Sequence, residues 1–527
     1  MHPIFVAIAL FGASTVSSKP DSLAKPVAPS DHDSGFSLTL VHVNDVHAHL
    51  DPTSVSMKVE GKSVQVPLGG AAILKAAFDS LRKARPQSLF LHAGDQFTGT
   101  AWFSLYRGLA DAAVVRRLGF DAFVPGNHEF DLGPEPLRAF LDSSRVPVVA
   151  STLDASREPI LAGRIPSVLM REVDGRRIGI VGIVHPSTPS LSRSGQNLRF
   201  REAASIAQAV DSATRAGAKA VVVLSHAGWE ADTMLARTVP GIACIVGGHS
   251  HTRMGVFPGL GRAPAYPVVV TSSQGSPVPV VHAWHGGLEV GVLTLKFDST
   301  GRMVSWEGQP FLPAPAGRAD GATEGVREFV PDSGMTALLQ GLARPLDSLR
   351  AIQVARIPAN DPRRKGVSLA DLCAQSLLEA GASHGARVGL VNRGGVRDDL
   401  DSGVLDMERV QRVAPFGNSV VVMTIPGNKL RHVVKILEGR RGAAGIAGLS
   451  GERDDKGRWR TFRLAGATSD LADTDTIRIA TNSYLADGGG GCMPLRKSKG
   501  YRYDTGIRDA DALARLLSRL FPVAKGN

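Results

Sequence analysis

The chain has 527 residues, which is long enough for two or more domains with separate hydrophobic cores. Its 43% hydrophobic and 21% charged residues are the proportions of an ordinary globular protein. The net charge of +11 favours anionic ligands such as phosphates, although Arg-rich usage is also explained by genome composition. No basic run is interleaved with aromatic residues, which argues against binding to a nucleic-acid polymer.

The cysteines also exclude two classes of site. Cys244, Cys373 and Cys492 are far apart in the chain and odd in number, so they form neither a disulfide framework nor a thiolate metal site. The stability of the fold must therefore come from the burial of apolar residues. Any metal ion must be held by His, Asp and Asn side chains.

The first residues predict an export signal. A short apolar stretch followed by small residues ends at about residue 18, although no Lys or Arg precedes it. The stretch is too short for a transmembrane span, and no later segment is long and apolar enough for one. Residues 19–35, rich in Pro, Ser and Asp, are expected to be a disordered lead-in. We therefore expect a secreted, periplasmic protein with no transmembrane segment.

The next 230 residues or so alternate between apolar strands and amphipathic helices, which is typical of an α/β domain. In chain order the sequence predicts strand 36–43, helix 69–82, strand 88–92, helix 110–118, strands 120–124, 146–150 and 177–184, helix 203–216, and strands 220–224 and 242–246. Loops at the carboxyl ends of such strands are where α/β proteins place their chemistry.

Five of these strands run into a loop that carries Asp, Asn or His. The loop residues are Asp45 and His47, then Asp95, then Asn127 with His128 and Asp131, then His226, then His249 and His251. One such loop alone is explained equally well by a helix N-cap, with Asn127 or Asp131 starting the next helix. Five successive loops of this kind are not explained that way. Asp, Asn and His together suit a divalent transition metal.

The sequence around these residues resembles the calcineurin-like metallophosphatase superfamily. The segments VHVNDVHAH, LHAGDQFTG, PGNHEFD, VVLSHAG and VGGHSH are similar, more narrowly, to its 5′-nucleotidase and UDP-sugar hydrolase family. The resemblance covers residues 36 to about 290 and resumes from about 367 to 495. It implies an α/β fold in which a four-layer α/β/β/α metallophosphatase domain precedes a smaller α/β 5′-nucleotidase C-terminal domain that binds substrate.

The resemblance also implies a role for each loop residue. Asp45, His47 and His251 would bind one divalent metal ion, Asn127, His226 and His249 would bind a second, and Asp95 would bridge the two. His128 would face the phosphate and stabilise developing charge, and Asp131 would orient its ring. The cofactors would be two ions of Zn, Mn, Co or Fe. His49 lies outside the matched pattern, and we expect it to be structural.

The second half begins after a stretch rich in Pro and Gly at 310–332, which predicts a domain boundary, and a joining helix at 335–349 follows. The next helix, 368–380, has Ser368 as its expected N-cap. The predicted organisation is a signal peptide at 1–18, a lead-in at 19–35, a metallophosphatase domain at 36–310, a linker with its helix at 311–351, and the substrate-binding domain at 352–527.

Several segments of this second half resemble the substrate loops of the family. The resemblance assigns phosphate contacts to Arg363 and Arg397, a base contact to Asn392, and stacking on the base to Phe416 and Tyr484. The register of the first arginine stays open, because Arg364 and Lys365 follow it directly. Phe416 is also explained as a core residue.

Two positions depart from the family pattern. Arg393 replaces a usual glycine, and Gly490 stands where the family carries an Asp that binds the ribose hydroxyls. Asp487 is close to that position, but on the other side of the turn. The glycine run 488–491 is also explained as a flexible turn. These departures keep a changed sugar preference or a non-nucleoside ester open.

The sequence as a whole predicts a secreted, dinuclear-metal phosphohydrolase that releases phosphate from 5′-nucleotides, with UDP-sugars as further candidate substrates. The expected partner is a small phosphate ester, and the oligomeric state is left open. One alternative is a 2′,3′-cyclic-nucleotide phosphodiesterase or a thiosulfohydrolase of the same architecture. A non-catalytic nucleotide-binding protein is the alternative of a different class.

Overall fold

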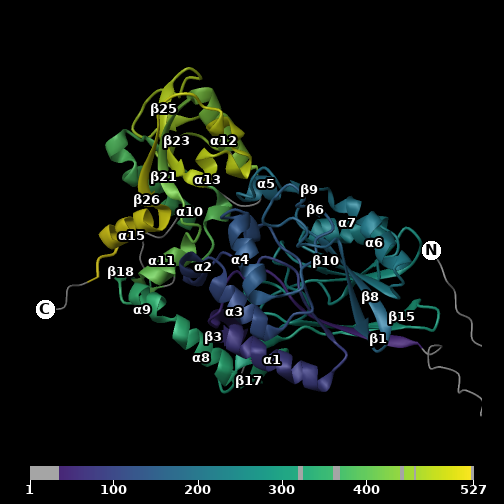
Figure 1. Cartoon of the computed structure of the whole chain (residues 1–527). Coiled ribbons are helices and arrows are strands. Elements are labelled where there is room, and N and C mark those ends of the chain that lie inside the picture. The colour runs from purple at the N-terminus through teal and green to yellow at the C-terminus, as the bar shows by residue number, and fades with distance from the viewer. Residues whose placement is uncertain are drawn as a thin grey trace, which may run out of the picture.

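A computed structural model describes residues 35–318, 324–359, 368–400, 402–439, 444–455 and 459–523. The predicted signal peptide, nearly all of the lead-in, and Arg363 lie outside the described residues. Figure 1 shows a larger N-terminal body and a smaller C-terminal body. Among the residues described, no helix combines the length and the apolar content needed to cross a membrane.

Two sheets form the centre of the N-terminal domain. The first contains β1 Phe36–Val43, β4 Leu89–His92, β5 Ala122–Phe123, β14 Gly291–Phe297 and β15 Met303–Gly308, in the order β15-β14-β1-β4-β5. The second contains β7 Val168–Val173, β8 Arg176–Ile183, β10 Ala220–Ser225, β11 Cys244–Gly247, β12 Val268–Thr271 and β13 Pro277–Val281, in the order β12-β13-β11-β10-β8-β7. Strands β1, β4 and β5 are parallel, and so are β8, β10 and β11.

The helices and 3₁₀ turns of this domain connect the strands, and the longer ones cover the outer faces of both sheets. They are α1 Ala71–Ala84, α2 Ala101–Tyr106, α3 Leu109–Leu118, η2 His128–Phe130, α4 Pro134–Ser144, α5 Thr188–Leu191, η3 Ala203–Ser205, α6 Ile206–Arg215 and α7 Trp229–Thr238. Helices α1, α3 and α4 lie on one side of the pair of sheets, and α6 and α7 lie on the other (Figure 1). Four short strands pair as β2 Thr53–Val59 with β3 Lys62–Leu68, and β6 Leu153–Asp154 with β9 Arg199–Phe200.

Side-chain alternation along β10 explains the layering. Val222 and Leu224 belong to the core that also contains β1 and β4, whereas Val221 and Val223 pack in a separate core with α6 and α7. Successive residues of a strand point to opposite faces, so the all-apolar β10 is buried on both. The predicted four-layer α/β/β/α arrangement is confirmed.

The C-terminal domain is built around a single sheet. Its strands are β19 Val388–Val391, β21 Ser419–Pro426, β22 Gly445–Ala447, β25 Thr476–Asn482 and β26 Arg502–Arg508, in the order β22-β19-β25-β21-β26. Two further pairs are β18 Gln353–Ile357 with β20 Gly403–Asp406, and β23 Leu449–Ser450 with β24 Arg463–Leu464. Its helices are α10 Leu369–Ala380, η5 Ala382–His384, η6 Arg393–Gly395, α11 Met407–Val413, α12 Gly427–Glu438, α13 Ser483–Ala486, η7 Gly489–Gly491, α14 Met493–Arg496 and α15 Asp509–Leu520. Helices α10 and α15 pack on one face of the sheet and α12 on the other.

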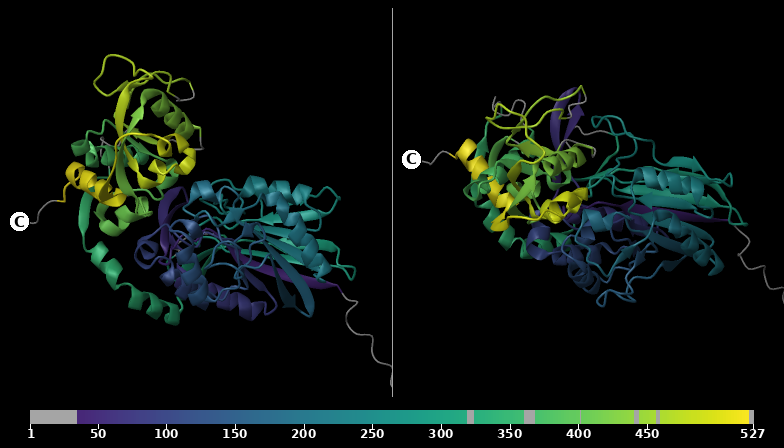
Figure 2. Two further views of the ribbon diagram at one scale, coloured as in Figure 1. Left: turned by 45° about the horizontal axis from the view of Figure 1, so that its top comes forward. Right: turned by 90° about the horizontal axis from the view of Figure 1, so that it is seen from above.

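The joining segment differs from the single helix expected at 335–349. It consists of α8 Ser333–Leu342 and α9 Arg344–Arg350, separated at Ala343. Pro345 lies in the first turn of α9, where its missing N–H costs nothing, but it cannot continue α8. Figure 2 shows the two helices as an arm along one flank of the molecule. The stretch before them contains a parallel pair, β16 Leu312–Pro315 and β17 Val326–Phe329.

Most predicted strands lie within two residues of their observed bounds, but the strand expected at 146–150 does not form. Only a single bridge joins Phe123 to Val148 there. Pro147 has no N–H to donate to a ladder, and its carbonyl accepts from Phe123 N–H at 2.9 Å. Helix α2 was not predicted at all.

The N-cap of α10 gives a direct test of this fold. Ser368 Oγ accepts the N–H of Asp371 at 3.1 Å, as predicted. We expect Ser368→Ala to destabilise the first turn of α10 by about 1 kcal/mol, because that N–H loses its acceptor. Hydrogen exchange of α10 would be several-fold faster in the variant, while Ser368→Thr, which keeps the hydroxyl, would match the wild type. Unchanged exchange in the alanine variant would contradict the cap.

Candidate active site

The five polar loops meet at the carboxyl edges of the two sheets. Strands β1, β4 and β5 of the first sheet, and β10 and β11 of the second, each end directly before one of the loops. Because parallel strands end at the same edge, their loops converge. The seven side chains predicted to bind metal are brought together here: Asp45, His47, Asp95, Asn127, His226, His249 and His251.

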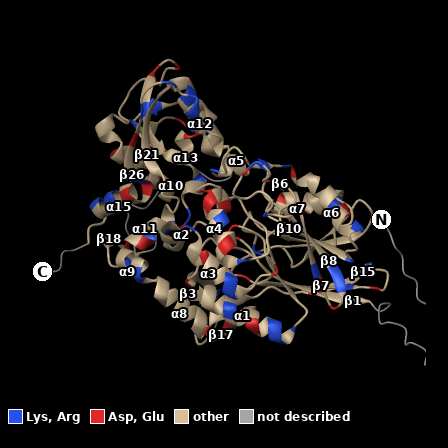
Figure 3. Cartoon of the chain, viewed as in Figure 1, with Lys and Arg blue, Asp and Glu red and all other residues tan. Residues whose placement is uncertain are grey.

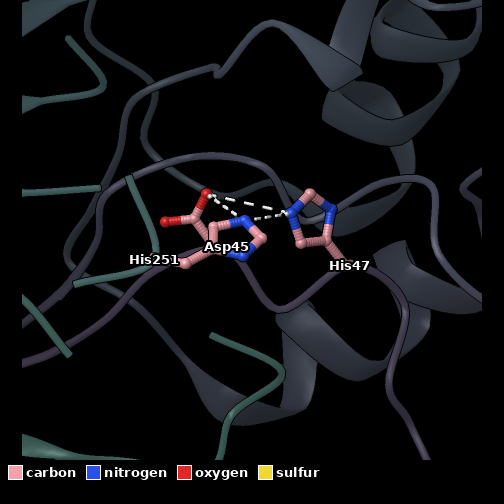
Figure 4. A group of neighbouring side chains, drawn as sticks. All are labelled: Asp45, His47 and His251. Carbon is pink, nitrogen blue, oxygen red and sulfur yellow. Dashed lines mark hydrogen bonds and ion pairs between the residues drawn. The ribbon is translucent and has the colours of Figure 1, made fainter. Parts of the chain in front are cut away.

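The first cluster consists of Asp45, His47 and His251, whose ligand atoms lie within 4.8 Å of one another. Figure 4 shows the two imidazole rings and the carboxylate pointing toward a common point. The two Nε2 atoms are 3.0 Å apart, and Asp45 Oδ1 lies 3.4 Å from His251 Nε2 and 3.8 Å from His47 Nε2. This spacing matches a set of donors around one cation.

The second cluster consists of Asp95, His226 and His249, again within 4.8 Å. His226 Nε2 lies 2.9 Å from Asp95 Oδ2, and Asn127 Oδ1 lies 2.9 Å from His249 Nδ1. Asp95 Oδ2 is also 3.9 Å from His47 Nε2 in the first cluster. Asp95 therefore lies between the two clusters, where a carboxylate with two oxygens can contact both.

Backbone carbonyls orient two of the rings toward these clusters. His47 Nδ1 lies 2.8 Å from the carbonyl of Thr98, and His226 Nδ1 lies 2.7 Å from that of Ala93. A carbonyl oxygen only accepts, so Nδ1 carries a proton in both rings, and Nε2 is the nitrogen that faces the clusters and is available to a metal ion. The Nε2 atoms of His47 and His251 lie 3.0 Å apart beside buried carboxylates, and imidazole nitrogens grouped with carboxylate oxygens are a donor set for a metal ion. The residues present therefore fit the two implied divalent ions.

The electrostatics of the clusters also favour cations. Burial alone would raise the pKa of Asp45, but His251 and His226 outweigh it and hold the pKa below its usual range. The pKa of Asp95 is likewise held well below normal. Burial opposes a charge on His226, yet Asp95 and Asp45 raise its pKa to about 10. Two buried carboxylates thus create a strong preference for positive charge between them.

The backbone of the loops is strained at the same residues. Five of the clustered side chains have a positive φ, between 50° and 71°: Asp45, His47, Asp95, His249 and His251. Such left-handed conformations cost on the order of 1 kcal/mol or more each for residues other than glycine. Gly126 permits the close approach of two loops, since a Cβ there would lie 2.2 Å from Asp95 Oδ1. The fold therefore holds these residues in a strained backbone conformation, and that conformation places their side chains around the two clusters.

Glu129 ties two of these loops together, a role that the sequence analysis missed. Its carboxylate accepts backbone N–H groups from Asp95 at 3.0 Å, Gln96 at 2.8 Å, Phe97 at 3.0 Å and Gly126 at 2.5 Å. The side chain is almost fully buried. The available signal was a carboxylate inside the Gly126–Asp131 motif that had no assigned partner.

His128 and Asp131 form a pair beside the clusters. His128 Nδ1 lies 2.7 Å from Asp131 Oδ2, and its Nε2 lies 4.0 Å from Asp95 Oδ2. Burial disfavours the charged ring, but Asp131 and Asp95 outweigh it and raise the pKa of His128. The N-cap alternative holds for Asn127 in position only, because Asn127 precedes η2 but its side chain makes no capping hydrogen bond. Asp131 is not an N-cap, since α4 begins after Gly133.

A cavity of about 520 Å³ opens beside the clusters and is lined by both domains. Its walls include Asn127, His128 and His249 from the N-terminal domain and the predicted residues Asn392, Arg397, Phe416 and Tyr484 from the C-terminal domain. Arg397 Nη2 donates to His47 Nε2 at 3.0 Å, so the C-terminal domain contacts the first cluster directly. A cavity of this size suits a small organic ligand.

The alternative explanations for two C-terminal features are not supported. Phe416 is only partly buried and stacks on His128, with ring centroids 5.7 Å apart, so it is not a core residue. The glycine run forms the 3₁₀ turn η7, whose Gly490 N–H donates to the Tyr484 hydroxyl at 2.8 Å. Asp487 is exposed and pairs with Arg502 at 2.5 Å, and it is not part of the cavity wall.

Glu129 provides a test of how the loops are held. We expect Glu129→Gln to lower the affinity for Mn²⁺ or Zn²⁺ by about tenfold or more, because an amide cannot accept all four N–H groups and the loops shift. Metal titration of the apoprotein by calorimetry measures the change. Glu135→Gln, at an exposed position in α4, is the matched control and should bind metal like the wild type. Equal affinity in the two variants would refute the positioning role.

Comparison with known proteins agrees with this geometry. Residues 38–253 match the family model for calcineurin-like phosphoesterase, and residues 350–497 match that for the 5′-nucleotidase C-terminal domain. A probable 5′-nucleotidase of Treponema pallidum (strain Nichols) is 29% identical, over 98% of this chain and 95% of that protein. The 5′-nucleotidase of Mus musculus is also 29% identical, over 94% of this chain and 90% of that protein.

A solved structure shows the same arrangement of both domains. The crystal structure of a 5′-nucleotidase precursor from Thermus thermophilus is 35% identical and superposes with a TM-score of 0.83, covering 93% of this chain and 98% of that chain. The two family models fall on the two domains that form the cavity. The chain therefore belongs to the 5′-nucleotidase family of calcineurin-like metallophosphatases, and it is a metal-dependent phosphoester hydrolase with a dinuclear metal site.

Proposed function

We propose that the protein releases phosphate from 5′-nucleotides in the cavity between its domains. The observation that carries this proposal is the set of residues that line the cavity from both domains. The metal-binding clusters and His128 lie on its N-terminal side, and an arginine and two aromatic residues lie on its C-terminal side. A phosphate needs the first set, and a nucleoside needs the second.

The phosphate would bind at the clusters. Two divalent ions held there by the Asp, His and Asn side chains would supply a hydroxide nucleophile from water near neutral pH and would offset charge on the phosphate oxygens. Asp131 and Asp95 raise the pKa of His128 and so favour the protonated ring, whose Nε2 can donate toward the leaving oxygen or a phosphate oxygen. Asp131 keeps Nδ1 of the same ring engaged, at 2.7 Å, and so fixes which nitrogen faces the substrate. Arg397 adds a fixed positive charge beside His47.

The nucleoside would extend along the C-terminal wall. Phe416 and Tyr484 offer two aromatic faces to a base, and Asn392 lies on the same wall. Phe416 rests on the ring of His128 in this structure, so a bound base would replace that contact. Rotation of the C-terminal domain about α8 and α9 is a simple route to this exchange. Arg363, the other proposed phosphate ligand, lies outside the described residues.

The finer parts of the proposal rest on the sequence and on the family. Export to the periplasm is supported by the predicted signal peptide at 1–18. UDP-sugars are further candidate substrates, because a site that stacks a base and binds its phosphate also fits the uridine half of such a molecule. The predicted domain boundaries at residues 310 and 351 are also proposed rather than observed.

The catalytic assignment is tested by phosphate release from 5′-AMP. Protein stripped of metal and then supplied with Mn²⁺ or Zn²⁺ should be active, and the stripped protein should not be. We expect His128→Ala to lower kcat by about 100-fold or more, because the proton at the leaving oxygen is lost. His432→Ala, at an exposed position on α12, is the matched control. Metal-dependent release that survives in His128→Ala would refute the assigned role.

The base pocket has a separate test. We expect Phe416→Leu to raise KM for 5′-AMP by about tenfold, since stacking on one aromatic face is lost. The same variant should hydrolyse a small aryl phosphate monoester, which has no nucleobase, within about threefold of the wild type. Parallel kinetics on the two substrates make the comparison. An equal loss on both, or no loss on AMP, would argue against a nucleotide pocket.

A further inference from the structure

The part of the cavity wall formed by α5 and η7 has an unusual charge distribution. Helix α5 of the N-terminal domain packs against η7 of the C-terminal domain, and Arg193, two residues after α5, lines the cavity there. Arg393 lies elsewhere on the cavity wall, within electrostatic range of Arg397, and both Arg193 and Arg393 are exposed. Among the described residues of the cavity wall, the only carboxylate is Asp131, which is already paired with His128 at 2.7 Å. A sugar bound here meets a cation and no free carboxylate.

The backbone at Gly490 contributes to this distribution. Gly490 lies on the cavity wall, and its N–H donates to the hydroxyl of Tyr484, which in turn donates to the carbonyl of Ser190 at 2.8 Å. No side chain projects from this position toward the ligand. Asp487 is turned outward and paired with Arg502. The ribose hydroxyls of a simple nucleotide therefore lack a charged acceptor on this side.

Arg193 is held at this point by its contact across the domain boundary. Its Nη2 donates to Ser483 Oγ at 3.0 Å, directly before Tyr484 in the chain. That contact uses one of the five N–H donors of a guanidinium, and a guanidinium binds phosphate oxygens through pairs of donors. The position thus combines a fixed cation, spare donors and a cavity. On the face shown in Figure 3, Lys and Arg residues elsewhere lie among Asp and Glu residues. The overall positive charge of the protein therefore does not explain why this part of the cavity has a cation and no free carboxylate.

We propose that Arg193 forms a second anion subsite, and that the preferred substrates are 5′-nucleotides whose ribose carries a further phosphate at the 2′ or 3′ hydroxyl. This proposal rests on the proposed 5′-nucleotidase function and names its substrate class. The scissile phosphate occupies the metal end, the base lies between the aromatic rings, and the second phosphate meets Arg193. The absence of a carboxylate at Gly490 removes the repulsion that such an anion would otherwise meet.

The first experiment compares adenosine 3′,5′-bisphosphate and 5′-AMP as substrates of the metal-loaded, full-length chain. Release of the 5′-phosphate is followed by chromatography of the nucleotide products. We expect kcat/KM to favour the bisphosphate by about tenfold or more, the value of one charge-assisted contact. Arg193→Gln, which keeps a donor for Ser483 but loses the charge, should abolish most of this ratio through KM. Arg193→Lys should retain part of it.

A matched pair at Gly490 tests the missing carboxylate. Gly490 has φ +62°, which Asp and Asn tolerate better than other side chains, and a Cβ would lie 3.3 Å from Leu485 Cδ2. Gly490→Asp should shift the ratio toward 5′-AMP by about tenfold, because the new carboxylate repels the second phosphate and accepts ribose hydroxyls. Gly490→Asn has the same size and backbone strain without the charge, and it should leave the ratio near that of the wild type.

The outcomes separate this inference from the function on which it rests. Hydrolysis of 5′-AMP without preference for the bisphosphate, or an equal effect of Arg193→Gln on both substrates, overturns the subsite and leaves the nucleotidase intact. In that case Arg193 only links the two domains, through its hydrogen bond to Ser483. If neither substrate is hydrolysed, calorimetry still decides the subsite. Tighter binding of the bisphosphate, lost in Arg193→Gln, supports it, and equal binding overturns it.

Discussion

Two carboxylates buried at the meeting edge of two sheets are the constraint on which the rest of this structure depends. Asp45 and Asp95 are taken out of water and surrounded by imidazole rings, two of which are oriented by backbone carbonyls. Buried charges of one sign are costly unless cations compensate them. The strained loop backbones and the Glu129 clamp keep these groups together despite that cost. Divalent cations would offset the buried negative charge of the two carboxylates. The site is therefore first of all a metal-binding site.

The second domain converts this centre into a selective site. On its own, the N-terminal domain presents metal-binding groups and His128 to solvent. The C-terminal domain closes a cavity over them, contributes Arg397 next to His47, and brings Phe416 and Tyr484 to the far wall. Contacts across the boundary at Ser190 and Ser483 fix the part of the wall formed by α5 and η7. In the proposed function, chemistry and selectivity are thus divided between the two domains.

Most of the fold and of the metal site could be predicted from the sequence. Buried parallel strands are continuous apolar runs, and the polar loops at their ends stand out against them, which is why β1 was predicted to the residue. The failures have local causes. Pro147 prevented a ladder that the apolar run 146–150 favoured, and Pro345 divided the joining helix. Glu129 and Arg193 were missed because their roles depend on backbone N–H groups and a domain contact that are distant in the chain.

The number of divalent ions bound per chain tests the central claim most directly. Crystals of the protein grown with Mn²⁺ or Zn²⁺, measured at the absorption edge of the metal, should show two anomalous peaks, one at each cluster on either side of Asp95. Asp95→Asn, which keeps the shape of the side chain but loses its charge, should retain at most one. A single ion in the wild type, ions away from the two clusters, or two full sites in Asp95→Asn would contradict the account.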